Sequence, residues 1–375
     1  MILSTQLSVS KYLEAAVFIG AQLCRDAIWS GQRCNWFGVP VREMNRSVVT
    51  EAQSICGSDF YKGTSGIAIF LARLFAATSE KIFRTTAEGA IRQALSRLDD
   101  FPQASRSDFY TGLTGVAYGL FEIADSCGIE KFKEMGLLIM EEVAADETSG
   151  SLTGAGCGAG TVTQLLRMHR RYKKDFLLHL ATKYGEKMRS QMASPADLTI
   201  DPQFSKLNVA AAMLELFKAT AGKEYRQAAE QVLRNVRNKN AANDNVRTAR
   251  ANLLAFEVLR EDIYCAYARE AIDIICSRID SCVELDRDFS LAHGFAGDGD
   301  LLLEASRVLA DEHLCSTAER VGNRGIERYQ KADLPWPCGS ASGWDSPSFM
   351  TGIAGIGYFY LRLHDSSRVH SLLLV

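Results

Sequence analysis

The chain has 375 residues, of which 47% are hydrophobic and 23% charged, with a net charge of −3 at pH 7 and a pI near 6.1. This charge balance gives no reason to expect nucleic acid as a partner. The length allows a substantial core, and the lack of Gly/Ser-rich or Pro-rich linkers predicts a single domain over residues 1–375. The densest basic run, residues 167–174, is interpreted as a solvated helix face.

The first apolar run of the chain is Ala15–Gly20, which lies between Glu14 and Arg25 at helical spacing. The preceding residues 1–10 lack the cationic region of a signal peptide, so we predict neither a signal peptide nor a membrane span here. Ten cysteines are scattered along the chain without any Cys-x-x-Cys pair. This usage is typical of a reducing compartment, and we expect a cytoplasmic protein.

Short glycine pairs recur along the chain, each at the start of a run of small and apolar residues. Because glycine destabilises a helix interior, a pair at i and i+3 indicates a backbone that needs a positive φ or packs closely. The pairs recur about every 45 to 58 residues, and the one longer gap has room for two further units, near residues 204–208 and 246–250. Seven repeats are therefore predicted. The glycines are Gly63 and Gly66, Gly112 and Gly115, a cluster from Gly154 to Gly160, Gly294 and Gly297, and Gly352 and Gly355.

The segments between the glycine pairs have the periodicity of helices. Residues 87–98 and 225–236 place apolar side chains at i, i+3, i+4 and i+7 beside charged ones, which predicts outer amphipathic helices. The runs that follow the glycine pairs, such as Ile67–Ala72, are apolar nearly all round and predict inner helices. A repeated helix pair without strand signals indicates an all-α fold, either a solenoid or a closed ring of helical hairpins.

Four further segments carry a resemblance: Cys34–Gly38, Ser290–Gly297, Trp336–Gly339 and the C-terminal stretch Pro347–Leu374. Together with the glycine repeats they resemble the lanthionine synthetase C family over essentially the whole chain, above all the cyclase half of the fused class II lanthipeptide synthetases. The resemblance implies an (α/α) toroid of seven inner and seven outer helices with a cavity at the glycine-loop end. It also implies a stand-alone unit, because no dehydratase half precedes it.

The family holds a catalytic zinc ion with two cysteines and one histidine, and leaves a fourth position open for a substrate thiol. The zinc-bound thiolate adds to a dehydroalanine or dehydrobutyrine and closes a thioether ring. The histidine and one cysteine come from a Cys-His-Gly motif, which here reads Ala292-His293-Gly294. The other cysteine belongs to the fifth repeat, but none occurs between Cys157 and Cys265. With two of three ligands missing, we expect no metal and no other cofactor.

The same match provides two candidates for catalysis. Lys206 takes the place of a fourth-repeat histidine that acts as general acid or base in the family. His293 is interpreted as a residue hydrogen-bonded to backbone, as a substrate contact or as a weak acid–base catalyst. Thr153 or Ser151 stands where the third repeat of the family has an aspartate, so no carboxylate is expected there.

Four further side chains are candidates for a cavity wall or a peptide contact. If Arg247 and Arg250 face the cavity, they would bind an anionic ligand or an acidic leader peptide. Asp298 is either a metal ligand or an acidic residue in the first turn of a helix, where the dipole favours it. Cys338, like Cys157, is an alternative zinc ligand beside the sixth-repeat histidine.

Three functions are compatible with this pattern. Loss of the ligands in an intact scaffold favours a zinc-free protein of ribosomal peptide biosynthesis that binds a precursor peptide or a partner enzyme. The second is a lanthionine cyclase without zinc, in which a pocket orients thiol and alkene and Lys206 or His293 acts as base. The third is a protein-interaction or regulatory module. Fold resemblance does not choose among these, so it stays open whether the chain is an enzyme.

Overall fold

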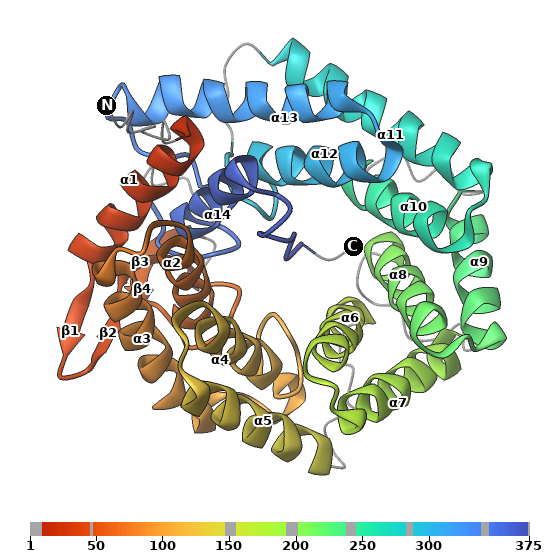
Figure 1. The fold of residues 1–375 in the computed structure, drawn as a ribbon, viewed down its shortest axis with the longest axis horizontal. Coiled ribbons are helices and arrows are strands. Elements are labelled where there is room, and N and C mark those ends of the chain that lie inside the picture. The colour runs from red at the N-terminus through yellow and green to blue at the C-terminus, as the bar shows by residue number, and fades with distance from the viewer. Residues whose placement is uncertain are drawn as a thin grey trace, which may run out of the picture.

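The computed structural model describes residues 10–45, 48–146, 155–192, 202–237, 245–282, 288–338 and 345–373. These residues form fourteen α-helices in two concentric rings, which confirms the all-α toroid (Figure 1). The inner ring consists of α2 (Thr64–Thr78), α4 (Leu113–Cys127), α6 (Ala155–Tyr172), α8 (Pro202–Thr220), α10 (Asn245–Leu259), α12 (Phe295–Leu309) and α14 (Ile353–His364). The outer ring consists of α1 (Lys11–Arg25), α3 (Lys81–Leu95), α5 (Glu130–Ala145), α7 (Asp175–Met192), α9 (Lys223–Arg237), α11 (Asp262–Ser281) and α13 (Glu312–Gly325).

Each inner helix packs against the outer helix that follows it in the chain, except α14, which packs against α1. Contacts of α14 with α2 then close the inner ring between the two ends of the chain. The helices α8 and α10 begin at residues 202 and 245, so the two repeats that lack a glycine pair lie where the spacing predicts them. No helix among the described ranges is long and apolar enough to cross a membrane.

The inner and outer helices differ in how much of their surface is buried, as the sequence predicts. In α2 every residue from Thr64 to Ala72 is buried, because the helix has neighbours on both sides and an outer helix behind it. The outer helix α9 buries only one stripe and exposes its charged face. That stripe consists of Tyr225, Ala228, Ala229, Val232, Leu233 and Val236.

The glycine pairs are explained by close packing and not by positive φ. The first glycine of each pair is the N-cap of an inner helix in an extended conformation, with φ of −98° at Gly63 and −136° at Gly112. The second lies against the carbonyl oxygen of a preceding loop residue, as Gly66 does with Phe60 and Gly355 with Phe349. A β-carbon would overlap that oxygen. The third cluster begins at Gly154, which lies outside the described residues, as do Ser151 and Thr153.

Backbone hydrogen bonds tie four of the glycine loops together. Tyr61 N donates to Tyr110 O over 3.0 Å, Met350 N to Tyr61 O over 3.0 Å, and Ala292 N to Met350 O over 2.9 Å. These residues precede α2, α4, α12 and α14, so the N-terminal ends of neighbouring inner helices are held at one end of the ring.

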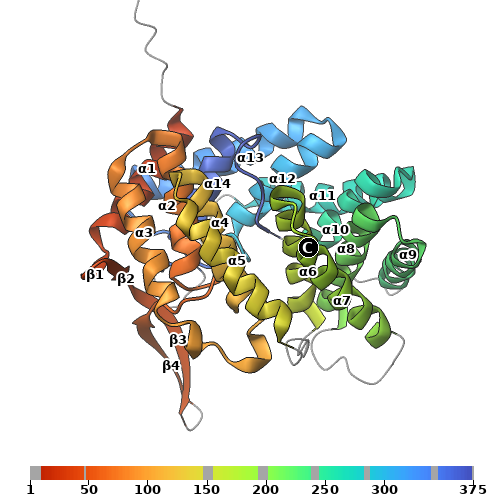
Figure 2. The same ribbon diagram turned by 60° about the horizontal axis from the view of Figure 1, so that its bottom comes forward.

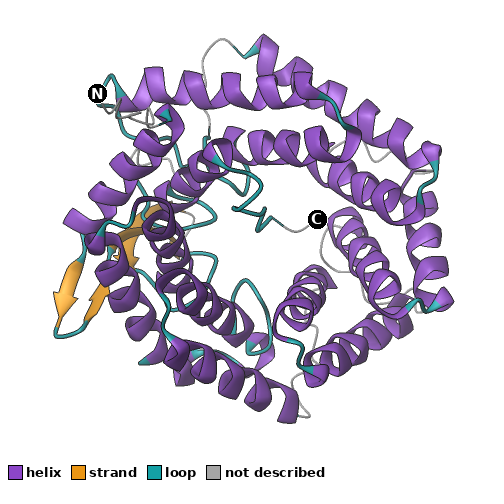
Figure 3. Cartoon of the chain, viewed as in Figure 1, coloured by secondary structure: helices purple, strands orange, loops and turns teal. Residues whose placement is uncertain are grey.

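Two β-hairpins follow α1, a feature that the sequence analysis missed (Figures 2 and 3). The first pairs β1 (Ile28–Ser30) with β2 (Arg33–Asn35), and Gly31 supplies the positive φ of 60° in its turn. The second pairs β3 (Phe37–Asn45) with β4 (Val48–Ile55) and projects from the ring. The valines of this segment favour strands.

Candidate functional site

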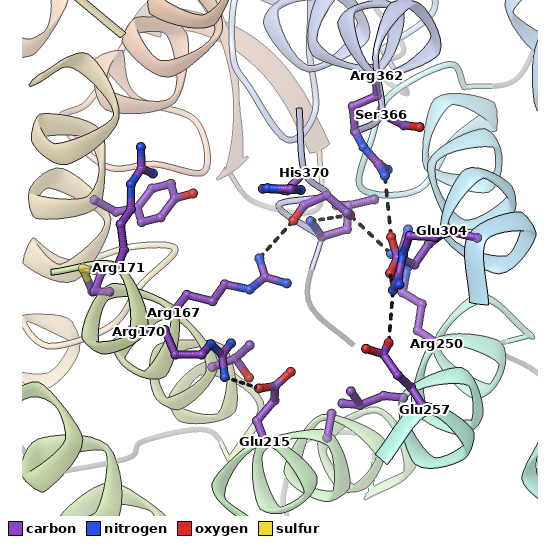
Figure 4. A pocket seen from close by; sticks show the side chains of 18 of the residues that line it. Arg167, Arg170, Arg171, Glu215, Arg250, Glu257, Glu304, Arg362, Ser366 and His370 are labelled. Atoms are coloured by element: carbon purple, nitrogen blue, oxygen red, sulfur yellow. Dashed lines mark hydrogen bonds and ion pairs between the residues drawn. The ribbon is translucent and has the colours of Figure 1, made fainter. Parts of the chain in front are cut away.

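A cavity of about 1010 Å³ lies at the centre of the ring (Figure 4). Its walls come from all seven inner helices, from about the middle of each to its C-terminal end, and from the tail after α14. No residue of the four tied glycine loops lines it. The cavity therefore lies toward the opposite end of the inner helices from the one that the family resemblance implies.

The tail, defined here as residues 365–373, runs into the ring, and its end lies near the axis (Figure 1). Side chains of the inner helices bind three consecutive carbonyl oxygens of this segment. Arg362 Nε donates to Val369 O over 3.1 Å, Tyr358 Oη to His370 O over 2.8 Å, and an Arg167 guanidinium nitrogen to Ser371 O over 3.0 Å. The ring thus holds an irregular stretch of its own chain through main-chain carbonyl oxygens.

Arg250 is the one sequence-predicted candidate that lines the cavity. It is buried and donates to Asp300 Oδ2 over 2.8 Å, while Arg362 pairs with the other carboxylate oxygen. Ser371 Oγ donates to Asp300 Oδ2 over 2.6 Å, which joins the tail to the same network. Burial alone would raise the pKa of Asp300, but Arg362 and Arg250 lower it below its usual range. The carboxylate is therefore ionised and shared between two arginines.

A second buried carboxylate, Glu122 of α4, joins two other arginines of the wall. Arg171 donates to Glu122 over 2.8 Å, and Arg73 of α2 also pairs with it. Arg170, the residue directly before Arg171, pairs with Glu215 of α8 over 2.9 Å. These arginines belong to the basic run 167–174, whose Arg170, Arg171, Lys173 and Lys174 are exposed as predicted; Arg167, Arg170 and Arg171 in addition line the cavity. The helix α6 packs against α7 and α8, and the three arginines lie on its lumen-facing side.

The other sequence-predicted candidates lie elsewhere. His293 is exposed in the loop before α12, and half-buried Lys206 lies in the N-terminal part of α8; neither lines the cavity. Arg247 lies near Tyr61 at the glycine loops, where its charge opposes part of the rise in the pKa of Tyr61 that burial causes. The peptide-contact prediction for these residues gains no support from the cavity.

Asp298 and Cys338 are also not part of the cavity wall. Asp298 is buried in the first turn of α12 and pairs with Arg278 of α11 over 2.6 Å, so it is an acidic residue at a helix start. Cys338 is buried, and burial raises the pKa of its thiol to about 12 although the backbone N–H of Ser346 opposes the shift. Neither side chain lines this cavity, so it gives no support to their prediction as cavity residues.

The sequence analysis did not predict most of the residues that line the cavity, among them Arg167, Glu122, Arg362 and those of the tail. One signal was present: Arg167, Arg170 and Arg171 share one face of a helix by their i, i+3, i+4 spacing. Since α6 packs against α7 and α8, its charged face lies toward the lumen.

Three comparisons place the chain among known proteins. No curated protein matches it. The solved structure of a nisin cyclase is similar with a TM-score of 0.59 and 14% identity, covering 82% of this chain and 89% of that one. A Listeria innocua protein, Lin0763, has a TM-score of 0.41 and 15% identity over 60% of this chain and 73% of its own. A sugar epimerase from a ruminal bacterium has a TM-score of 0.41 and 11% identity over 94% and 98%.

The nisin cyclase likeness shows the fold alone, and the two weaker ones carry no argument. The family model described as "Lanthionine synthetase C-like protein" matches residues 54–197 and 245–374, which is well over half of the sequence. That match includes the glycine loops, most of the inner helices and the tail. The chain therefore belongs to the lanthionine synthetase C-like family.

Proposed function

We propose that this chain binds a peptide inside the ring, beside its own tail, and does not carry out zinc-dependent thioether formation. The observation that carries the proposal is the capture of three consecutive main-chain carbonyls of the tail by Arg362, Tyr358 and Arg167. Every peptide offers such carbonyls, and arginine presents several N–H donors in a fixed fork. The volume of about 1010 Å³ equals the upper end of the usual range for ligand pockets.

The residues matched to the zinc ligands do not fit a zinc centre. His293 is exposed, its neighbour Ala292 has no ligating side chain, and no cysteine exists in the fifth repeat. Within the described ranges, no three His, Cys, Asp or Glu side chains are grouped so that they would hold a metal. Cys338 gives no replacement, because a buried thiol with a pKa of about 12 is protonated at neutral pH, whereas zinc binds the thiolate.

We expect untagged, purified protein to contain well below one zinc ion per chain when its metal content is measured by plasma mass spectrometry. The His293→Ala variant is expected to show the same low content, because the wild-type histidine has no partner ligands among the described residues. Zinc near one per chain that disappears in His293→Ala would contradict the proposal and indicate a cyclase with a different set of ligands.

A second experiment separates binding from cyclisation. The probe is a library of random ten-residue peptides, each with one cysteine and one dehydroalanine. We expect the protein to retain a subset of them while the free-thiol count equals that of a protein-free control. Loss of one thiol per peptide at unchanged mass, slowed by Lys206→Ala or His293→Ala, would instead show a zinc-independent cyclase. No contact in the described residues favours that alternative, because neither side chain lines the cavity.

A further inference from the structure

Arg167 differs from the other cations of the cavity wall. Nine Arg or Lys side chains line the cavity, and among the described residues eight of them form an ion pair with a carboxylate. Arg167 forms none; its hydrogen bond goes to the carbonyl oxygen of Ser371, and its guanidinium extends from α6 toward the tail (Figure 4). A guanidinium has five N–H donors, so most of its donor capacity is left for a ligand.

The surroundings of Arg167 are electropositive. His370 of the tail lies beside it, and burial together with Arg167, Arg73 and Arg362 lowers the pKa of this imidazole, while Glu122 acts in the opposite direction. The Nε atom of Arg73 is buried and has no hydrogen-bond partner among the described residues. Arginines of α2, α6 and α14 thus surround one neutral histidine in this corner of the cavity.

Tyr118 of α4 adds a neutral donor to the same corner. Its side chain lines the cavity; burial and the Glu122 carboxylate raise the pKa of its hydroxyl group, and Arg167 and Arg73 oppose this rise. Two guanidinium groups, a phenol and an imidazole are the donor set with which proteins bind carboxylate and phosphoryl oxygens. The carboxylate that would balance Arg167 in an ordinary ion pair is missing from the described part of the wall.

We propose that Arg167, Arg73, Tyr118 and His370 form an oxyanion subsite, which binds a carboxylate or phosphoryl group of the peptide that the ring holds. The inference rests on the proposed peptide-binding function and names the chemical group that such a ligand carries. The oxyanion takes the place of the missing carboxylate partner of Arg167, and the neighbouring contacts to the carbonyls of residues 369–371 show that main chain fits alongside it.

A bound oxyanion stabilises the charged form of the imidazole, so it raises the pKa of His370 toward and above its ordinary value. By linkage, the oxyanion then binds more tightly as the pH falls through that pKa. The groups that face His370 are Arg73, Arg167, Arg362 and Glu122. Three of these groups are arginines, which stay charged throughout the pH range of the titration. The imidazole is therefore the group whose protonation near neutral pH reports oxyanion binding.

The test is an NMR titration of the histidine rings in the full chain, at a constant ionic strength that is set with NaCl. Sodium sulfate represents a phosphoryl group, and sodium acetate represents a carboxylate. The sequence has six histidines, and His370→Gln assigns the relevant signal. We expect a saturable rise in the pKa of His370 with at least one anion, and the anion that saturates first identifies the group. Arg167→Gln is expected to weaken this binding about tenfold or more.

Two further variants make the result specific. Arg170→Gln removes the same charge from the same helix but leaves the oxyanion subsite intact, so it is expected to bind within about threefold of wild type. Arg167→Lys retains the charge and is expected to recover part of the affinity, which excludes misfolding as the cause of the loss. The proposal would be overturned if the titration of the wild type did not saturate. It would also be overturned if Arg167→Gln and Arg170→Gln lost the same amount of affinity for the anion.

The peptide library separates this inference from the proposed function when phosphoserine is included among its residues. We expect the retained peptides to be enriched in Asp and Glu or in phosphoserine, and the enrichment to disappear with Arg167→Gln. Peptides that are retained without any such enrichment contradict the subsite alone. If no peptide is retained, the peptide-binding function fails, while the sulfate and acetate titrations still decide whether the subsite exists.

Discussion

Replacement of Gly355 by alanine is expected to destabilise the protein by at least about 3 kcal/mol, which is a large part of the roughly 5–15 kcal/mol of a typical domain. Gly355 lies in the first turn of α14, and a β-carbon there would overlap the carbonyl oxygen of Phe349 and lie 2.9 Å from Leu291 Cδ1. Phe349 is fully buried, so the loop has no space into which it can move. Urea unfolding monitored by circular dichroism, with soluble yield as a second readout, measures the effect.

Gly119→Ala is the matched control, because Gly119 also lies in an inner helix. Its nearest neighbour would be Ile91 Cδ1 at 3.2 Å, the end of a side chain that is able to rotate. Alanine is also favoured over glycine in a helix interior by about 0.5–1 kcal/mol. We expect this variant to unfold at the same urea concentration as wild type or a higher one. Equal stability of Gly355→Ala and Gly119→Ala would show that loop packing does not require the repeated glycines.

Asp300→Asn is expected to cost about 3–5 kcal/mol, because it leaves Arg250 and Arg362 buried without their shared anion. Asp300 is 1% exposed, and the tail joins the network through Ser371. The amide that replaces the carboxylate would direct N–H donors at one guanidinium, which has no acceptor. Urea unfolding at pH 7 measures the loss. Asp280→Asn removes an exposed carboxylate that pairs with Arg320 over 2.9 Å, and as the control it should stay within about 0.5 kcal/mol.

The pH dependence gives this prediction a second readout. Because the pKa of Asp300 is lowered in the folded state, its contribution to stability is present above the unfolded value of about 3.9 and is lost as the pH falls toward the folded one. The stability difference between wild type and Asp300→Asn should therefore be constant from pH 7 to 5 and become smaller below about pH 4. A difference that stays the same down to pH 3 would mean that the two arginines do not lower this pKa.

Local patterns in the sequence determined the repeat architecture. The glycine pairs and their spacing predicted seven helical hairpins, including the two units without a glycine pair, which the structure shows as α8 and α10. This works because close packing of an inner helix on its preceding loop is a local constraint, in which Gly66 meets Phe60 and Gly355 meets Phe349. The valine-rich segment at 39–49 was missed because the dominant glycine-repeat pattern is helical and does not extend to it.

Only the tertiary structure decided which charged side chains face one another in the lumen. Arg167 contacts Ser371 across 204 residues of chain, and Ser371 contacts Asp300 across 71. Such pairs form because ring closure brings the seven inner helices around one axis, so that side chains from distant repeats line one lumen. The same closure makes three arginines of the exposed basic run of α6 part of the wall of a cavity. Helical periodicity shows which residues of that run share a face, but the direction of the face depends on all the other repeats.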